Sequence, residues 1–162
     1  MDLDKLFELA TPYLGKNDFG VGHTRRVFDI AKNNFSVNPV LEELIFSSII
    51  LLDIGGSTIN DQYKKGPQIA TLLLKTLNCS ASFVAQVCKI ISSHHEHPDN
   101  PSEVFQVLYD SDKIVMFSKE EYPYYNSQNG FDWNKIVDLI YSTDGKKLAQ
   151  EWLTERKKES NR

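Results

Sequence analysis

Apolar side chains recur three and four positions apart along most of this chain, which is the spacing of one face of an α-helix. Around His23, for example, that face is formed by positions 23, 27, 30 and 31. No segment alternates apolar and polar residues for long, so strands are not expected. The spacing predicts a single all-α bundle of about seven or eight helices, over residues 3–14, 23–31, 39–53, 67–77, 80–91, 102–115, 132–141 and 144–158.

Capping and helix-breaking residues set the expected boundaries. Asn38 and Pro39 predict a helix start, because Asn is a good cap and proline needs no N–H donor at the first helical position. Pro67 likewise predicts the start of the fourth helix, and the pair Gly55-Gly56 predicts the end of the third. Further starts are predicted at Ser80 and Ser102.

Two segments are expected to be irregular. Residues 119–131 are aromatic and polar and predict a loop. Its tyrosines Tyr122, Tyr124 and Tyr125 either line a substrate cleft or a partner surface, or pack over the core. The charged tail at 155–162 is expected to fray. No linker or repeat divides the chain, so we expect one domain over residues 1–162.

Composition narrows the functional classes. The formal net charge is −4, from 18 basic and 22 acidic residues, which argues against bulk binding of nucleic acid. Cys79 and Cys88 form no CxxC pair and are interpreted as reduced thiols. The N-terminus has no signal-peptide pattern, and the longest apolar run, residues 49–52, is far too short to cross a bilayer. We therefore expect a cytoplasmic protein without a membrane partner.

Asp53 is the acid whose surroundings are most unusual. It directly follows the apolar run at 49–52 and lies at the expected end of a helix, where the helix dipole is negative. A buried carboxylate there needs a cation, a strong donor or a proton. A metal ion is one solution, and exposure to solvent or capping of the next turn is the other.

The four histidines fall at His23 and in the window that contains His94, His95 and His97. His23 lies on an apolar helix face, as a metal ligand or as a hydrogen-bonded core residue. The adjacent His94 and His95 are expected to border one cleft at the end of the fifth helix, with His97 in the loop beyond. The spacing of this window matches neither a zinc finger nor a zincin motif.

Asp110 and Asp112 stand two positions apart on a predicted helix and therefore on opposite faces. One of them is expected to point into the core and the other to be solvated or to support the first. Lys113 either neutralises the buried acid or contacts a ligand. Taken with His23, Asp53 and the His94–His95 pair, these acids have the composition of a divalent metal site built from imidazole and carboxylate.

Five motifs in register give the chain a resemblance to the HD superfamily of metal-dependent phosphohydrolases. The resemblance covers about residues 18–152. The matching segments are Gly22-His23-Thr24-Arg25-Arg26-Val27, Phe46 to Gly55, Gln62-Tyr63-Lys64-Lys65-Gly66-Pro67, Ile90 to His95, and Leu108 to Ile114, with a closing helix like that at Tyr141 to Ala149.

The resemblance implies an all-helical HD domain around a divalent metal ion, which would be Mn²⁺, Fe²⁺, Ni²⁺, Zn²⁺ or Mg²⁺. Its metal ligands correspond to His23, Asp53 and Asp112, of which Asp53 or Asp112 would orient the attacking water. The paired His94 and His95 correspond to positions that contact substrate phosphate or bind a second metal. Lys113 follows the last ligand and would reach a phosphate.

Leu52 departs from the family pattern, because it stands where the signature has a histidine next to the aspartate. Leucine cannot coordinate a metal, so the ion is expected to bind weakly, to recruit His94 or His95, or to be lost. The activity that the resemblance implies is hydrolysis of a nucleotide or another small phosphate ester. The alternative is an HD-fold module that binds a phosphate-bearing ligand or a protein partner without turnover. A homodimer is compatible with the sequence, and no feature specifies one.

Overall fold

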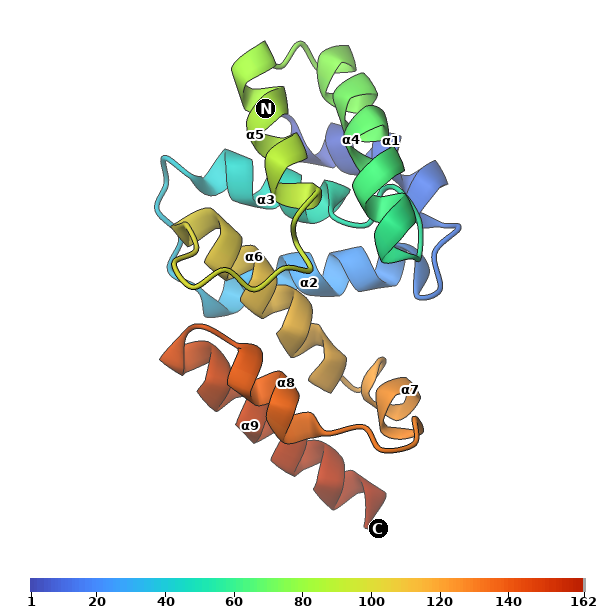
Figure 1. Cartoon of the computed structure of the whole chain (residues 1–162), viewed down its shortest axis with the longest axis vertical. Coiled ribbons are helices and arrows are strands. Elements are labelled where there is room, and N and C mark those ends of the chain that lie inside the picture. The colour runs from blue at the N-terminus through green and yellow to red at the C-terminus, as the bar shows by residue number, and fades with distance from the viewer. Residues whose placement is uncertain (162) are drawn as a thin grey trace.

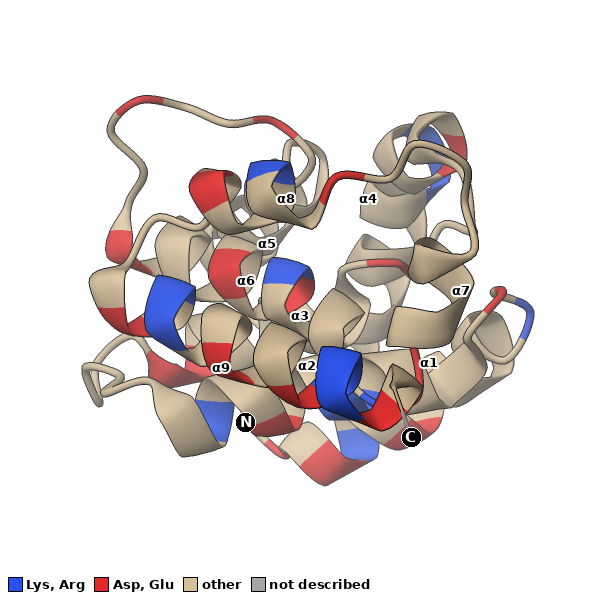
Figure 2. Cartoon of the chain, turned by 90° about the horizontal axis from the view of Figure 1, so that it is seen from below, with Lys and Arg blue, Asp and Glu red and all other residues tan. Residues whose placement is uncertain are grey.

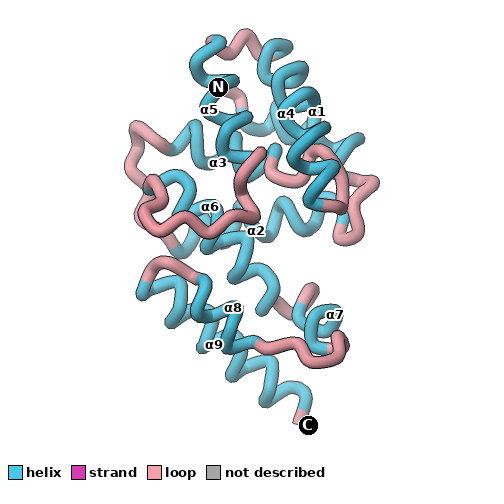
Figure 3. The backbone as a smooth tube through the Cα atoms, in the orientation of Figure 1, coloured by secondary structure: helices cyan, strands magenta, loops and turns pink. Residues whose placement is uncertain are grey.

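The structure, a computed structural model, describes residues 1–161 and consists of helices joined by short connections (Figure 1). This described part contains no strand, as the helices and connections of Figure 3 show. The prediction of an all-α bundle is confirmed. The helices are α1 (Leu3–Leu14), α2 (Gly20–Asn34), α3 (Glu42–Leu51), α4 (Ile59–Thr76), α5 (Ala81–Ile91), α6 (Glu103–Ile114), the 3₁₀ helix η1 (Val115–Phe117), α7 (Tyr122–Asn126), α8 (Trp133–Leu139) and α9 (Thr143–Ser160).

Helix α3 is the centre of the bundle. Every residue from Ile45 to Leu51 is buried, as expected of a helix that is apolar on all sides. The segment contributes to two apolar cores: Leu52 packs with α2, α6, η1, α8 and α9, and Ile54 packs with α1, α4 and α5. In Figure 1, α3 lies between α4 and α5 on one side and α6 on the other. Asp53 is therefore held in place by the burial of both its neighbours.

The two serines predicted to start helices do cap them. Ser80 accepts a hydrogen bond from the N–H of Phe83 at α5, and Ser102 accepts one from that of Phe105 at α6. Asn38 instead caps a turn before α3, where its side chain accepts from the N–H of Val40 at 3.1 Å. The third helix consequently begins at Glu42, later than predicted.

The prediction that Pro67 opens the fourth helix is wrong. Helix α4 already begins at Ile59, where the Thr58 side chain accepts a hydrogen bond from the Asp61 N–H at 3.1 Å. Its first turns lie directly against Gly55, since a Cβ on Gly55 would stand 2.5 Å from the Asp61 carbonyl oxygen. This close backbone packing and the Thr58 cap hold the turns before Pro67 helical, although proline removes one hydrogen bond of the helix.

Two further segments are more ordered than the sequence suggests. Residues 122–126 of the predicted loop form α7, because Tyr122 is buried and stacks on Trp133 with ring centroids 4.7 Å apart. Helix α9 continues to Ser160, because Arg156 is buried and pairs with two glutamates of its own helix. Residues 155–160 of the tail that was expected to fray are thus helical, and Arg162 lies outside the described residues.

Acidic and basic residues are interspersed on the helices seen in Figure 2 rather than gathered by sign. Over residues 1–161, no helix combines the length and the apolar character that crossing a bilayer requires.

Candidate metal centre

A cavity of about 350 Å³ opens beside the C-terminal end of α3. Its lining includes His23 of α2, Asp53 after α3 and Asp112 of α6, which come from three separate parts of the chain. Another part of the lining comes from Gln62 and His95. The bundle thus brings the three metal ligands implied by the HD resemblance to one place.

His23 is the residue around which the carboxylates gather. Its Nε2 atom lies 3.1 Å from Oδ2 of Asp53 and 3.3 Å from Oδ1 of Asp112. Its other ring nitrogen, Nδ1, lies 3.0 Å from both carboxylate oxygens of Glu121. Burial alone would lower the pKa of His23, but its hydrogen bonds to Asp112, Asp53 and Glu121 raise this pKa far above its ordinary value. Positive charge is therefore strongly favoured at this point.

His94 approaches the same carboxylate from the other side. It is 1% exposed, and its Nδ1 lies 2.7 Å from the carbonyl oxygen of Ile91, to which it can only donate. Its Nε2 lies 3.5 Å from Oδ1 of Asp53 and makes no hydrogen bond within the described chain. A neutral His94 would thus direct a nitrogen lone pair at a carboxylate oxygen. That arrangement is stable only when a proton or a metal ion supplies positive charge between the two atoms.

His95 has a different environment from its neighbour. Gln62 donates from Nε2 to the carbonyl oxygen of Gly56 at 2.9 Å, which turns its Oε1 toward His95. The Nε2 of His95 donates to that Oε1 at 2.6 Å, so the free lone pair of the neutral ring is on Nδ1. Burial and the nearby charge of His94 lower the pKa of His95 to about 4, and the ring is neutral at pH 7.

Asp53 and Asp112 are two carboxylates that lie against one imidazole ring, that of His23. Burial alone would raise the pKa of Asp53, but the rings of His23 and His94, which face its two oxygens, hold this pKa well below its usual range. Asp112 is likewise lowered, against its burial, chiefly by its hydrogen bond from His23. Two buried carboxylates that stay ionised side by side require shared positive charge. A divalent cation meets this requirement with the same nitrogen and oxygen atoms.

Among residues 1–161, two groups of three residues offer ligand atoms within 4.8 Å of one another. One group is His23, Asp53 and Asp112, and the other is Asp53, His94 and His95. Asp53 belongs to both, with Oδ2 directed toward His23 and Oδ1 toward His94. The residues present therefore fit a divalent ion, because imidazole and carboxylate ligands suit the metals expected from the sequence.

Three residues singled out in the sequence lie elsewhere. Leu52 is 2% exposed and packs in the apolar core, so it does not face the ligands. His97 is exposed, as expected for a loop residue, and its contacts lie away from the cavity. Its Nε2 lies 2.8 Å from the Leu139 carbonyl oxygen, and its ring stacks on Tyr141 with ring centroids 4.4 Å apart. Asp110 is fully buried on the opposite side of α6 from the ligands.

Of the two aspartates on α6, Asp110 points into the core and Asp112 lines the cavity. The side chain of Asp112 is only 13% exposed, and Asp110 is 0% exposed. Asp110 accepts hydrogen bonds from the backbone N–H groups of Tyr141 at 2.7 Å and Ser142 at 2.9 Å. Burial raises the pKa of Asp110, and these two hydrogen bonds oppose part of that rise. The helix therefore uses both of its polar faces inside the protein.

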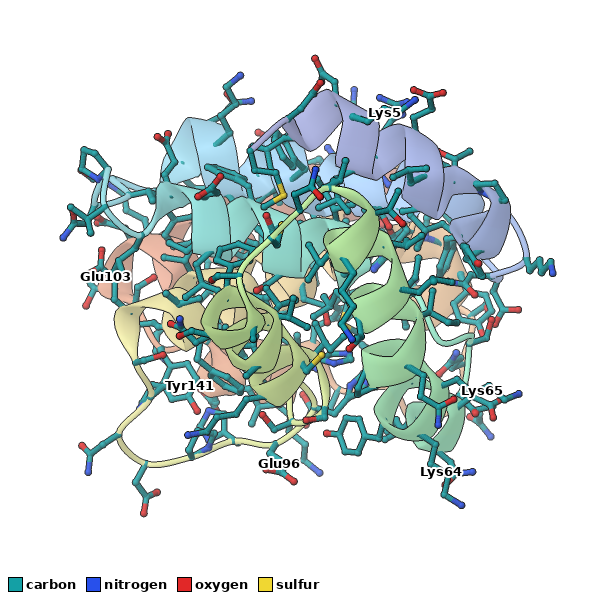
Figure 4. The ribbon with its side chains drawn as sticks, turned by 90° about the horizontal axis from the view of Figure 1, so that it is seen from above. Lys5, Lys64, Lys65, Glu96, Glu103 and Tyr141 are labelled. Carbon is teal, nitrogen blue, oxygen red and sulfur yellow. The ribbon has the colours of Figure 1, made fainter. Side chains whose placement is uncertain are left out.

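Lysines near the site differ in their reach. Lys113 lines the cavity, and its ammonium lies 5.2 Å from the ring centroid of Tyr109. Lys64 and Lys65 belong to α4 and point outward into solvent in Figure 4. Among these three lysines, only Lys113 is placed to meet a ligand in the cavity.

The sequence pattern did not identify Glu121 or the aromatic residue Phe19. Glu121 is completely buried in a segment expected to be a loop, and Phe19 lines the cavity with Tyr124 and Tyr125. One signal pointed toward Glu121: Arg26 is three positions after His23 on α2 and needs an anion on the same face. The sequence offered no means of choosing among 22 acidic residues for that anion.

No protein-family model, no curated protein and no solved structure matches this chain. The arrangement combines imidazole and carboxylate ligands, a lysine and an aromatic wall around one cavity. Such a set can bind a divalent ion together with a small anionic ligand.

Proposed function

We propose that this protein is a divergent member of the HD superfamily and a metal-dependent phosphohydrolase that acts on a nucleotide or another small phosphate ester. The observation that carries the proposal is the convergence of His23, Asp53 and Asp112 from α2, α3 and α6 at one cavity. These are the three positions that the HD motifs assign to metal ligands. Their spacing along the chain is long, so their meeting is independent of the local sequence.

His23, Asp53 and Asp112 would hold the ion, and His94 would supply the donor that Leu52 cannot. The position of Leu52 in the core leaves the family's signature ligand absent. The Nε2 of His94 is buried, has no hydrogen bond and faces Asp53 at 3.5 Å. It therefore offers a nitrogen ligand at the edge of the same carboxylate. His95 would join it as a ligand through Nδ1, with Gln62 holding its ring.

When bound, the ion would polarise a phosphoryl oxygen and lower the pKa of a coordinated water. Asp53 or Asp112 would orient the attacking water and accept its proton, because both stay ionised in the site. Lys113 would stabilise negative charge on the phosphate from the cavity wall. When neutral, His94 directs a lone pair at Asp53, and His95 carries its free lone pair on Nδ1. This favours a role as metal ligands over a role as phosphate donors.

The aromatic wall supports a substrate with a planar group. Phe19, Tyr124 and Tyr125 line the cavity, and Phe19 packs edge-on to Tyr124 with ring centroids 5.3 Å apart. Tyr124 remains 52% exposed, so its ring is open to contact. Aromatic faces of this kind stack on nucleobases. A nucleotide would place its phosphate near Lys113 and its base near this wall.

The proposal is tested by metal analysis and turnover together. Protein purified without added metal should carry Mn, Fe, Ni or Zn, or bind one on addition, and should release phosphate from part of a nucleotide and sugar-phosphate panel. Asp53→Asn should abolish both properties, because it removes a charge shared by both ligand groups. Asp138→Asn, on an exposed site of α8, is the matched control and should retain them. A wild-type protein with neither metal nor turnover would refute the proposal.

A second candidate function follows from the burial of Leu52. If the site has lost catalysis, the protein would bind a phosphate-bearing ligand without hydrolysing it. Leu52→His separates the two functions. For an enzyme whose fourth donor is His94, this variant should destabilise the fold by about 2–4 kcal/mol, since it buries a polar ring in the core, and should not raise Mn²⁺ affinity. Turnover that is absent in the wild type and appears in Leu52→His would instead favour the binding module.

A further inference from the structure

Glu121 is a fully buried acid that none of the HD motifs in this chain includes. It lies immediately before α7, in the segment that follows η1, and is 0% exposed. A buried carboxylate is costly unless cations and hydrogen-bond donors compensate it. The residues that compensate Glu121 therefore indicate what it does.

Both of its cationic neighbours come from α2. The Nδ1 of His23 lies 3.0 Å from each carboxylate oxygen, and Nε and Nη2 of Arg26 both lie 3.0 Å from Oε2. His23 and Arg26 are three positions apart, so they share one face of the helix. Gly22 leaves room for this arrangement, because a Cβ at that position would come within 2.9 Å of Nη1 of Arg26.

The geometry decides which ring nitrogen of His23 faces the candidate ligands. A carboxylate has acceptors only, so the hydrogen between His23 and Glu121 is on Nδ1. The Nε2 atom is thereby directed to Asp53 and Asp112, at 3.1 and 3.3 Å. If the ring of His23 rotated by half a turn about its Cβ–Cγ bond, the hydrogen bond from Nδ1 to Glu121 would be lost. A different ring atom would then face Asp53 and Asp112.

We propose that Glu121, itself held by Arg26, is the positioning residue that keeps Nε2 of His23 directed at the metal site. This inference rests on the proposed metal-binding function of that site. Glu121 would act through His23 and would touch neither the ion nor the substrate. The carboxylate of Glu121 would also make His23 a stronger metal ligand, because a carboxylate partner raises the basicity of a metal-bound histidine.

Glu121 has a structural role as well, and the test must separate the two. Its carbonyl oxygen accepts the N–H of Tyr124 at 3.1 Å, which anchors α7. Glu121→Gln keeps this backbone bond and the side-chain volume and removes the charge. Asp110→Asn is the matched control, because Asp110 is equally buried but accepts its hydrogen bonds from Tyr141 and Ser142, away from the cavity.

The experiment measures Mn²⁺ affinity by titration calorimetry in wild type and both variants, with thermal melting to verify folding. Glu121→Gln should weaken Mn²⁺ binding about 10- to 100-fold, the usual effect of removing such a support, and Asp110→Asn should stay within about threefold of wild type. In ¹H–¹⁵N spectra of the histidine rings, the Nδ1–H signal of His23 should lose its downfield, carboxylate-bound position in Glu121→Gln alone. Asp110→Asn should leave that signal in place.

Unchanged Mn²⁺ affinity in a folded Glu121→Gln protein would overturn the inference while leaving the proposed function intact. A wild-type protein that binds no divalent ion would overturn both. If Glu121→Gln does not fold, Arg26→Lys serves instead, since it keeps the charge but loses the two-atom contact with Glu121. It should weaken Mn²⁺ binding about 3- to 10-fold, in line with a milder loss of support, and an unchanged affinity there would overturn the inference.

Discussion

Helix α6 carries two aspartates, two positions apart, that lie in very different surroundings: Asp110 is fully buried and Asp112 lines the cavity. Asp110 faces the start of α9, where the N–H groups of Tyr141 and Ser142 satisfy both of its oxygens. Asp112 faces His23 and shares it with Asp53, so an acid meets a second acid instead of a pair of donors. The first region is a closed hydrogen-bonded joint, whereas the second retains acceptors that a cation can use.

The histidines repeat this contrast. His97 belongs to the region of Asp110: it lies 2.8 Å from the Leu139 carbonyl oxygen, stacks on Tyr141 and is otherwise exposed. In Figure 4 Tyr141 lies on the opposite side of the view from Lys64 and Lys65 of α4. His94 also contacts a backbone carbonyl, but its second nitrogen is buried against Asp53. Residue type and burial are therefore weak guides to function, and the nature of the partner atoms is the stronger one.

The largest effect is expected from removing one charge from each region in turn. Asp112→Asn should weaken Mn²⁺ binding by more than about 100-fold, beyond the usual loss for a residue that only supports a ligand. Asp110→Asn should leave the affinity within about threefold. Titration calorimetry measures both. Equal losses of Mn²⁺ affinity in the two variants would contradict the assignment of metal binding to Asp112 rather than to Asp110.

Metal addition should stabilise the protein through only one of these regions. An ion that binds the folded state alone adds about 2.7 kcal/mol at 100 times its Kd. For a chain of this size, that corresponds to a rise in melting temperature of roughly 5–11 °C. Thermal scans with and without Mn²⁺ should show the rise in wild type and Asp110→Asn. Asp112→Asn should show a much smaller one, and a full rise in that variant would place the bound ion elsewhere.

Asp110→Asn should instead destabilise the fold. The amide retains one acceptor for the two backbone N–H groups and adds a donor that faces them, so about 1–3 kcal/mol of unfolding free energy should be lost. Urea denaturation measures the change. An unaltered stability would show that Asp110 does not secure the start of α9.

The smallest effect is expected at His97. His97→Gln removes an exposed stacking contact and should change stability by less than about 0.5 kcal/mol, with Mn²⁺ affinity unchanged. His94→Gln, in the same sequence window, should lower the affinity about 10-fold or more, because its buried nitrogen faces Asp53. The pair is compared in the same calorimetric titration, and similar affinities in both variants would contradict a ligand role for His94.

Local rules predicted the helices where the local chain decides them. Ser80 and Ser102 begin helices as expected, since a side-chain cap acts within a few residues. Pro67 misled the prediction because the contact of Gly55 with Asp61 overrides a local preference. Residues 122–126 were missed for a similar reason, because the stacking of Tyr122 on Trp133 is not visible in local periodicity.

The sequence by itself determined the helical class, because periodicity is a property of the chain. Its resemblance to the HD superfamily singled out His23, Asp53 and Asp112 as candidate ligands and Leu52 as the departure from the family pattern. Tertiary structure decided that His94 faces Asp53, that Asp110 secures α9 and that Glu121 contacts His23. Each of these depends on which atoms of distant segments meet, and on which nitrogen of a histidine carries its hydrogen. Such choices are made by the packing of helices around α3, where burial makes every unpaired charge costly.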